Sequence, residues 1–132
     1  LWAVASDCGV RILAENLPKK SLVNGSAPQL RVTDGGRLAG ICMDVNHLFL
    51  ETHAEFIAKA GALIRSTHFS DYDGLEERHW LPGMGVVPWK GVLRDLAAAG
   101  YEGPYLFEVR PDDQGRPYPA KRLAGCLTPY ME

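Results

Sequence analysis

The sequence is poor in cysteine and has no long apolar run. Its three cysteines, Cys8, Cys42 and Cys126, are odd in number and widely spaced. They form neither a CxxC zinc pattern nor an obvious disulfide framework, which predicts a reducing, cytoplasmic setting. No run of about 18 apolar residues is present, so the sequence predicts no membrane-spanning helix.

A surplus of basic residues is also missing. The chain has 14 Lys and Arg against 16 Asp and Glu, a net charge of −2. Proteins that bind nucleic acid without sequence specificity depend on Lys and Arg to neutralise phosphates, so we predict no nucleic-acid partner. There is no basic stretch followed by an apolar one, as a signal peptide would have, but the chain opens on Leu1 rather than Met. We expect the natural protein to be longer at its N-terminus.

Short apolar runs alternate with helical patterns along the chain. Strands are predicted over residues 10–14, 40–43, 63–67 and 105–107. Helices are predicted over residues 1–8, for a short stretch after Pro28, around 54–61 with a face of small apolar residues, from Pro88 to about 97, and weakly from about Ala120. The predicted face around 54–61 consists of Ala54, Ile57, Ala58 and Gly61. Strands that alternate with helices indicate βαβ units and a parallel sheet, hence an α/β fold.

Two architectures agree with this pattern: an open doubly wound sheet, or part of a (β/α)8 TIM barrel. A complete barrel needs about 250 residues. The 132 residues, taken as a single domain over 1–132, would supply four βα units, about half of a barrel. An isolated half would leave two strand edges unpaired. It would therefore need a missing N-terminal half or a second copy to complete it.

Each predicted strand ends in a residue that can bind a metal: Glu15, Asp44, His68 or Glu108. Parallel strands point the same way, so these side chains would meet at one rim, where α/β barrels carry their active sites. Crowded carboxylates repel one another, and one divalent cation (Mn²⁺, Mg²⁺, Co²⁺ or Zn²⁺) would remove the repulsion. Taken singly, each acid also fits a helix cap or a solvated loop.

A loop of about twenty residues separates the third strand from the next helix, and loops of this length are usually functional or disordered. We interpret Asp71 and Asp73 as turn-formers beside Gly74, and His53 as a surface or packing residue. Trp80 and Trp89 could line a sugar-binding pocket, although Trp89 fits the buried face of a helix equally well.

Four segments of the sequence resemble the sugar phosphate isomerase/epimerase superfamily, the xylose isomerase-like TIM barrels. They are Ala14–Pro18, Gly40–His47, Pro82–Trp89 and Gly103–Glu108, and they keep the family's order along the chain. The resemblance implies a metal-dependent sugar or sugar phosphate isomerase/epimerase, with Glu15, Asp44, His68 and Glu108 as metal ligands. The substrate would lose a proton next to its carbonyl, and the metal would stabilise the resulting enediolate.

The same resemblance assigns further roles. Glu15 and Glu108 would also exchange protons with the substrate carbon. His47 would face the oxygens of the sugar, and His79 would lie near the same pocket, so both are predicted to bind substrate. Independently of the resemblance, Arg110, just beyond Glu108, is a candidate to hold a substrate oxygen or carboxylate.

Three alternatives stay open. The first is a type-IV apurinic endonuclease-like zinc phosphodiesterase, because Glu77 and His79 resemble the Asp-x-His pair that holds an extra zinc there, together with the position of His47. The second is a dehydratase of keto-polyols, which needs the same cation and the same proton abstraction. The third is an inactive fragment.

Overall fold

The computed structural model describes residues 1–18, 24–37 and 39–131. Helices and strands alternate in the order α1 (Trp2–Asp7), β1 (Leu13–Glu15), α2 (Ser26–Val32), β2 (Gly40–Asp44), α3 (His53–Ala60), β3 (Ile64–Phe69), α4 (Trp89–Ala98), β4 (Tyr105–Phe107) and α5 (Ala120–Cys126). Short 3-10 helices cover η1 (Val45–His47), η2 (Gly61–Leu63) and η3 (Thr128–Tyr130). Among the described residues, no helix has the length and apolar character needed to cross a membrane.

The four strands form one sheet in the order β1-β2-β3-β4, and every neighbouring pair is parallel. The prediction of an α/β fold with a parallel sheet is therefore confirmed. In the register between β2 and β3, Asp44 lies opposite His68. Sequential order with parallel pairing means that each connection crosses back over the sheet through a helix, which is the βαβ unit.

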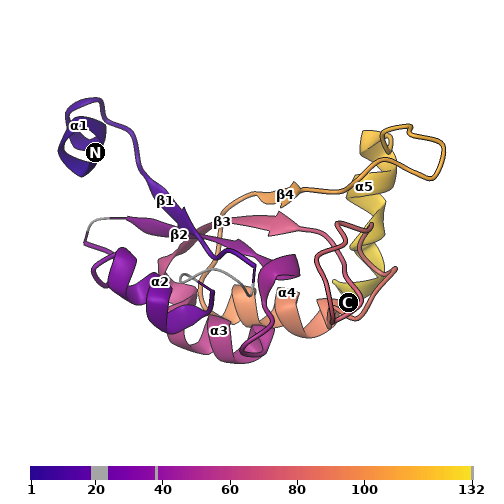
Figure 1. The fold of residues 1–132 in the computed structure, drawn as a ribbon, viewed down its shortest axis with the longest axis horizontal. Coiled ribbons are helices and arrows are strands. Elements are labelled where there is room, and N and C mark those ends of the chain that lie inside the picture. Colours follow the sequence, from indigo (N-terminus) through magenta and orange to yellow (C-terminus); the bar gives the residue numbers. More distant parts are fainter. Residues whose placement is uncertain (19–23, 38, 132) are drawn as a thin grey trace.

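Helices α2, α3 and α4 cover one face of the sheet, and the opposite face is open (Figure 1). The core lies between the sheet and these helices, where the largest fully buried apolar side chains are Trp89, Phe56, Phe69, Ile41, Met43, Ile64, Leu96, Val45 and Val92. Helices α1 and α5 stand at opposite ends of the sheet, away from this core (Figure 1). Leu1, which precedes α1, and Val4 on α1 are exposed, whereas Ala5 on the same helix is buried.

Local signals fix the ends of the central helices. Thr52 caps α3 by accepting a hydrogen bond from the backbone N–H of Glu55, and the Glu55 side chain accepts one from the Thr52 N–H in return. After α4, Gly100 adopts a φ of +76°, a left-handed conformation that favours glycine and ends the helix there.

The predicted boundaries and faces need some correction. The first strand begins at Leu13 rather than at residue 10. Helix α2 begins at Ser26, ahead of Pro28, because proline is compatible with the first turn of a helix. The predicted apolar face of α3 is wrong at Ala54 and Ala58, which are exposed. The core-facing residues are Phe56, Ile57 and Ala60. Part of the polar stretch predicted over residues 19–37 lies outside the described residues.

Candidate metal centre

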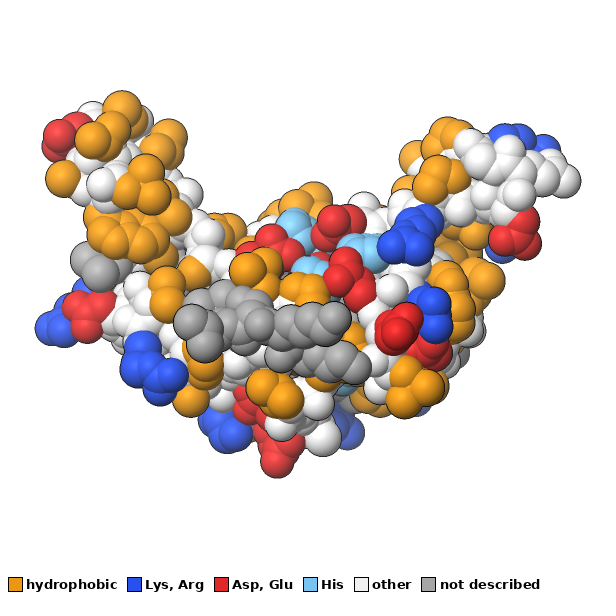
Figure 2. Space-filling model, in the orientation of Figure 1, with side chains coloured by type: hydrophobic (Ala, Val, Ile, Leu, Met, Phe, Trp, Pro, Cys, Tyr) orange, Lys and Arg blue, Asp and Glu red, His pale blue; other side chains and the backbone are white. Residues whose placement is uncertain are grey.

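The ends of the four strands meet at one point. Glu15, Asp44, His68 and Glu108 each offer one ligand atom, and these atoms all lie within 4.8 Å of one another. His68 is central, because its Nδ1 lies 3.2 Å from Glu15 Oε1, 3.1 Å from Glu108 Oε2 and 3.8 Å from Asp44 Oδ2. Figure 2 shows carboxylate and histidine side chains gathered on the open side of the sheet, between the two projecting ends of the molecule.

Asn16 fixes the position of Asp44 through its backbone. The Asn16 amide donates to the Asp44 carbonyl oxygen at 2.9 Å, and its oxygen accepts from the Asp44 N–H at 2.8 Å. Both residues are fully buried. The sequence analysis treated Asn16 only as a residue that breaks the first strand. The available signal was a polar residue directly after Glu15, the last residue of the predicted strand.

Asp44 is the most perturbed acid of the group. The pKa of its carboxyl group is raised to about 8, mainly by burial and in addition by the negative charges of Glu15 and Glu108, although a hydrogen bond from the Asn46 N–H opposes the change. The other carboxylate oxygen, Oδ2, is buried and accepts no hydrogen bond from any described residue. A buried oxygen without a partner, facing two further carboxylates and an imidazole, fits a divalent cation.

A second group of possible ligands lies beside the first. His47, Glu77 and His79 also offer ligand atoms within 4.8 Å of one another. Glu77 Oε1 lies 2.5 Å from His79 Nε2 and 3.5 Å from His47 Nε2. The hydrogen bond from His79 lowers the pKa of Glu77, so its carboxyl group is ionised near neutral pH. The structure thus brings His47 and His79 next to the four strand-end residues, with the His47 Nδ1 only 3.5 Å from Asp44 Oδ2.

The long loop before α4 is organised by Asp71. This fully buried carboxylate accepts hydrogen bonds from the backbone N–H groups of Tyr72, Gly83 and Val87 and from the Trp89 indole. The interpretation of Asp71 as a turn-former beside Gly74 is therefore wrong, because its carboxylate reaches residues much later in the loop. The sequence did not indicate this role of Asp71, because hydrogen bonds across a loop leave no spacing pattern in the sequence.

For Asp73, the turn interpretation is confirmed. Its carboxylate accepts from the N–H groups of Leu75 and Glu76, two and three residues further along, and pairs with Arg78. These contacts lower the pKa of Asp73 to about 2.

The structure also shows where the remaining candidate residues lie. His53 is buried and bonded to the Val45 carbonyl oxygen at 2.8 Å, which confirms a packing role. Trp89 belongs to the core, whereas Trp80 is half-buried near Arg78. Arg110 is exposed, and its backbone N–H donates to the His79 carbonyl oxygen at 2.8 Å. Its predicted contact with substrate is untested.

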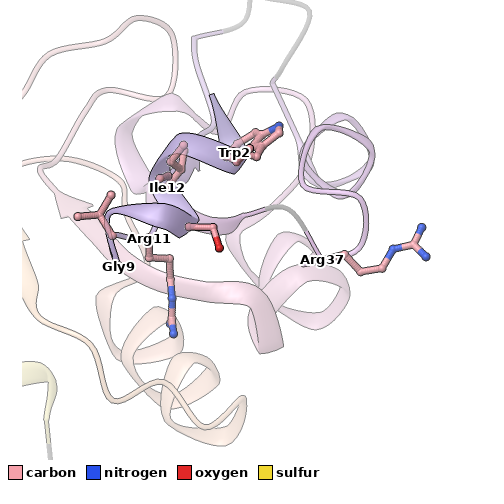
Figure 3. Close-up of a pocket in the computed structure, with 9 residues that line it drawn as sticks. Trp2, Gly9, Arg11, Ile12 and Arg37 are labelled. Atoms are coloured by element: carbon pink, nitrogen blue, oxygen red, sulfur yellow. The ribbon is translucent and has the colours of Figure 1, made fainter.

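A separate hollow of the surface lies away from the strand ends. It has a volume of about 640 Å³ and lies between α1 and the segment leading into β1 (Figure 3). Trp2, Ile12, Arg11 and Arg37 line it, and the described residues of its wall include no carboxylate or imidazole. It therefore lacks the groups needed for acid–base or metal chemistry, and the strand-end cluster is the better candidate site.

Comparison with known proteins identifies the family. The pattern of the Xylose isomerase-like TIM barrel family matches residues 1–130. The chain belongs to this family. The fold is accordingly part of a xylose isomerase-like barrel rather than an open doubly wound sheet, which resolves the two architectures left open by the sequence.

Several of the proteins to which this chain is similar are named as sugar epimerases or as epimerase-like. Fructoselysine 3-epimerase of Escherichia coli O157:H7 is 38% identical over 54 residues, which are 41% of this chain and 20% of that protein. The crystal structure of a D-tagatose 3-epimerase-like protein superposes with a TM-score of 0.70 at 26% identity, covering 80% of this chain and 42% of that one. The 3-keto-D-glucoside 4-epimerase YcjR from E. coli has a TM-score of 0.72 at 20% identity, over 97% and 48% of the two chains, and shows the fold alone.

The chain therefore spans less than half the length of these relatives. In the matched structures, the rest of the barrel is supplied by residues that this sequence does not contain.

Proposed function

We propose that this chain is the C-terminal half of a divalent-metal-dependent sugar or sugar phosphate isomerase/epimerase. The observation that carries the proposal is the convergence of Glu15, Asp44, His68 and Glu108 from four successive parallel strands on one point. The names of the relatives support a sugar substrate, since one is a fructoselysine 3-epimerase and a similar structure is that of a D-tagatose 3-epimerase-like protein. The net charge of −2 agrees with a small-molecule substrate rather than nucleic acid.

The four strand-end residues have two proposed roles, metal binding and proton transfer. Bound at the four ligands, a divalent cation would polarise the substrate carbonyl as a Lewis acid. Glu15 and Glu108 come from the ends of the two outer strands, β1 and β4, and both reach the His68 Nδ1, at 3.2 and 3.1 Å. Epimerisation requires one group to remove a proton from one face of a carbon and a second group to return it to the other face, and we assign these two roles to Glu15 and Glu108.

The remaining residues would set the geometry. Asn16 holds the end of β2 by two hydrogen bonds to Asp44, so that the Asp44 carboxylate does not have to be ordered when substrate binds. We propose that His47 and His79, which lie next to the four ligands, face the substrate. Arg110 is proposed to hold a substrate oxygen or carboxylate, because its backbone is bonded to His79.

Two measurements on the purified protein test the proposal. The first is metal content after loading with Mn²⁺ and desalting. The second is exchange of deuterium from D₂O into the carbon next to the carbonyl of ketoses such as D-tagatose, D-psicose and fructoselysine. We expect bound metal and measurable exchange in the wild type. Replacing Glu108 by Gln should lower exchange by about 10²–10⁴-fold, the usual contribution of a general acid–base group.

Glu102→Gln is the matched control, because Glu102 is an exposed glutamate six residues earlier in the same segment. It should leave both readings unchanged. Equal metal retention and equal exchange in the two variants would refute the assignment.

A zinc phosphodiesterase is the second candidate, and the neighbouring group of His47, Glu77 and His79 is the observation that favours it. Cleavage of an oligonucleotide with one abasic site by the zinc-loaded protein would support it and count against the sugar enzyme. A keto-polyol dehydratase would use the same four ligands, and loss of water from an inositol-type ketone would reveal it. Absence of metal binding and of all three activities would leave the inactive fragment.

A further inference from the structure

Asn24 joins two segments that follow different strands. Its side chain is 3% exposed, and its amide nitrogen donates to the Leu17 carbonyl oxygen at 2.7 Å and to the His47 carbonyl oxygen at 2.5 Å. Leu17 follows β1, and His47 is the last residue of η1, which follows β2. An amide nitrogen carries two N–H groups, and carbonyl oxygens only accept, so this one side chain holds both backbone segments beside the strand ends.

The short helix η1 is held at both of its ends. At its start, Asp44 Oδ1 accepts a hydrogen bond from the Asn46 N–H at 2.7 Å. At its end, the His47 carbonyl oxygen accepts from Asn24. Because a carboxylate is planar and the Asn46 N–H fixes Oδ1, the position of η1 sets the direction in which Asp44 Oδ2 points. This second oxygen is buried and lies 3.8 Å from His68 Nδ1.

Helix α2 keeps Asn24 in place. Gly25 has a φ of +87°, a left-handed conformation that favours glycine, and it turns the chain from Asn24 into the first residue of α2. Further along the same helix, the Gln29 side chain donates to the Glu15 carbonyl oxygen at 2.7 Å. The helix is therefore bonded directly to the end of β1, and Asn24 extends this fixed segment to η1 at the end of β2.

We propose that Asn24 is a positioning residue for the metal ligand Asp44. Its amide holds η1, and η1 places the Asn46 N–H that orients the Asp44 carboxylate, so that Oδ2 faces the other strand-end ligands. Asn16 holds the Asp44 backbone, whereas Asn24 sets the rotation of the carboxylate. Residues that orient a metal ligand without touching the ion usually contribute about 10- to 100-fold to metal affinity.

The inference deepens the proposed function and rests on it for the presence of a cation at the strand ends. It does not depend on the identity of the substrate, so metal binding alone tests it. The two proposals can fail separately, because Glu108→Gln removes one of the four ligands, whereas substitutions of Asn24 keep all four and change only how Asp44 is oriented.

The test is Mn²⁺ binding to the purified protein, measured in two ways. Calorimetry gives the Kd, and the relaxation rate of water protons at saturating Mn²⁺ reports how many waters bind the ion directly. Asn24→Leu keeps nearly the shape of the side chain but has no N–H donor. We expect its Kd to rise about 10- to 100-fold. The saturated ion should also hold an additional water, because Asp44 Oδ2 no longer reaches it.

Thr33→Val is the matched control. Thr33 is fully buried at the other end of α2, and its hydroxyl donates to the Gln29 carbonyl oxygen at 2.8 Å. This variant also loses a buried hydrogen bond, so it should unfold at a lower urea concentration, but its Kd and its number of bound waters should equal those of the wild type. If Asn24→Leu does not fold, Asn24→Ser, which is smaller and keeps one O–H donor, replaces it in the same comparison.

Two results would overturn the inference. One is a wild-type Kd or a wild-type number of bound waters in the Asn24 variant while Glu108→Gln loses the ion, which would leave the proposed function standing. The other is an equal weakening of Mn²⁺ binding in Thr33→Val, which would assign the loss to general destabilisation. If the wild type itself binds no Mn²⁺, the proposed function is wrong and the inference is wrong with it.

Discussion

The indole N–H of Trp89 donates a hydrogen bond to the Asp71 carboxylate at 2.9 Å, joining the first residue of α4 to the start of the loop that carries Glu77 and His79. Both residues are buried, and the carboxylate has no cation beside it in the described part of the chain. Its charge is stabilised by N–H donors alone, so the loop depends on keeping each of them.

Trp89→Phe is expected to destabilise the protein. It removes one of four hydrogen bonds to a buried carboxylate, and a hydrogen bond to a charged group contributes about 1.5–3 kcal/mol. Urea denaturation would measure the loss. Trp80→Phe is the control, because Trp80 is only half-buried, with the Arg78 guanidinium over its ring, and the substitution should cost under about 1 kcal/mol. An equal loss of unfolding free energy in both variants would show that the smaller ring, and not the lost hydrogen bond to Asp71, causes the destabilisation.

Asp44→Asn should stabilise the metal-free fold while weakening metal binding. Asp44 Oδ2 is buried without a hydrogen-bond partner among the described residues, and a neutral amide removes the cost of burying this charge beside Glu15 and Glu108. Because the substituted side chain keeps an oxygen for the Asn46 N–H, we expect a gain of about 1 kcal/mol in the free energy of unfolding. The measurement is urea denaturation with a chelator present.

Asp34→Asn is the comparison for this gain, since Asp34 lies at the surface and pairs with Arg37. It should leave the free energy of unfolding unchanged or slightly lower. If Asp44→Asn destabilises the metal-free protein, the negative charge is already compensated in the fold and the case for a cation weakens.

His53 predicts part of the pH dependence of stability. Burial lowers its pKa below the ordinary 6.5, although the bond to the Val45 carbonyl opposes this. Above pH 6.5 neither folded nor unfolded chains carry the proton. As the pH falls below 6.5 the unfolded chain takes it up first, so the contribution of His53 to stability is lost in that direction.

Replacing His53 by Gln keeps a donor for Val45 and removes the titration. The difference in unfolding free energy between wild type and His53→Gln should therefore shrink as the pH is lowered from 7 to 5. The data should be collected with a chelator, because His47, His68 and His79 lie in the candidate metal sites. A difference that stays constant over this range would refute the assignment.

Two glycine substitutions should have opposite effects. A Cβ on Gly85 would lie 2.1 Å from the Tyr72 carbonyl oxygen and 2.4 Å from Asp71 Oδ1, so Gly85→Ala must displace the loop. We expect it to cost about 2 kcal/mol or more in the free energy of unfolding. A Cβ on Gly91, inside α4, meets no atom within 4 Å, and Gly91→Ala should stabilise the protein by about 0.5–1 kcal/mol. Thermal melts of both variants measure the two effects. An unchanged melting temperature for Gly85→Ala would show that the loop can move to accommodate the added Cβ without loss of stability.

The sequence by itself determined the alternation of helices and strands, the parallel sheet and the four residues at the strand ends. Hydrophobic periodicity is a local property, and Glu15, Asp44, His68 and Glu108 all follow directly on or within a predicted apolar run. Once the strands are parallel, their last side chains have to emerge at one edge. The core face of α3 was predicted wrongly at Ala54 and Ala58, because small apolar residues suit the surface as well as the core.

Only the tertiary structure decided how the long loop serves the site. Asp71 reaches the N–H groups of Gly83 and Val87, twelve and sixteen residues away, and Asn16 reaches Asp44 across twenty-eight residues. It also decided that the rings of His47 and His79 contact the carbonyl oxygens of Asn16 and Glu108. Such contacts depend on which surfaces meet after the chain has folded. The order of residues along the chain carries no periodic signal for them.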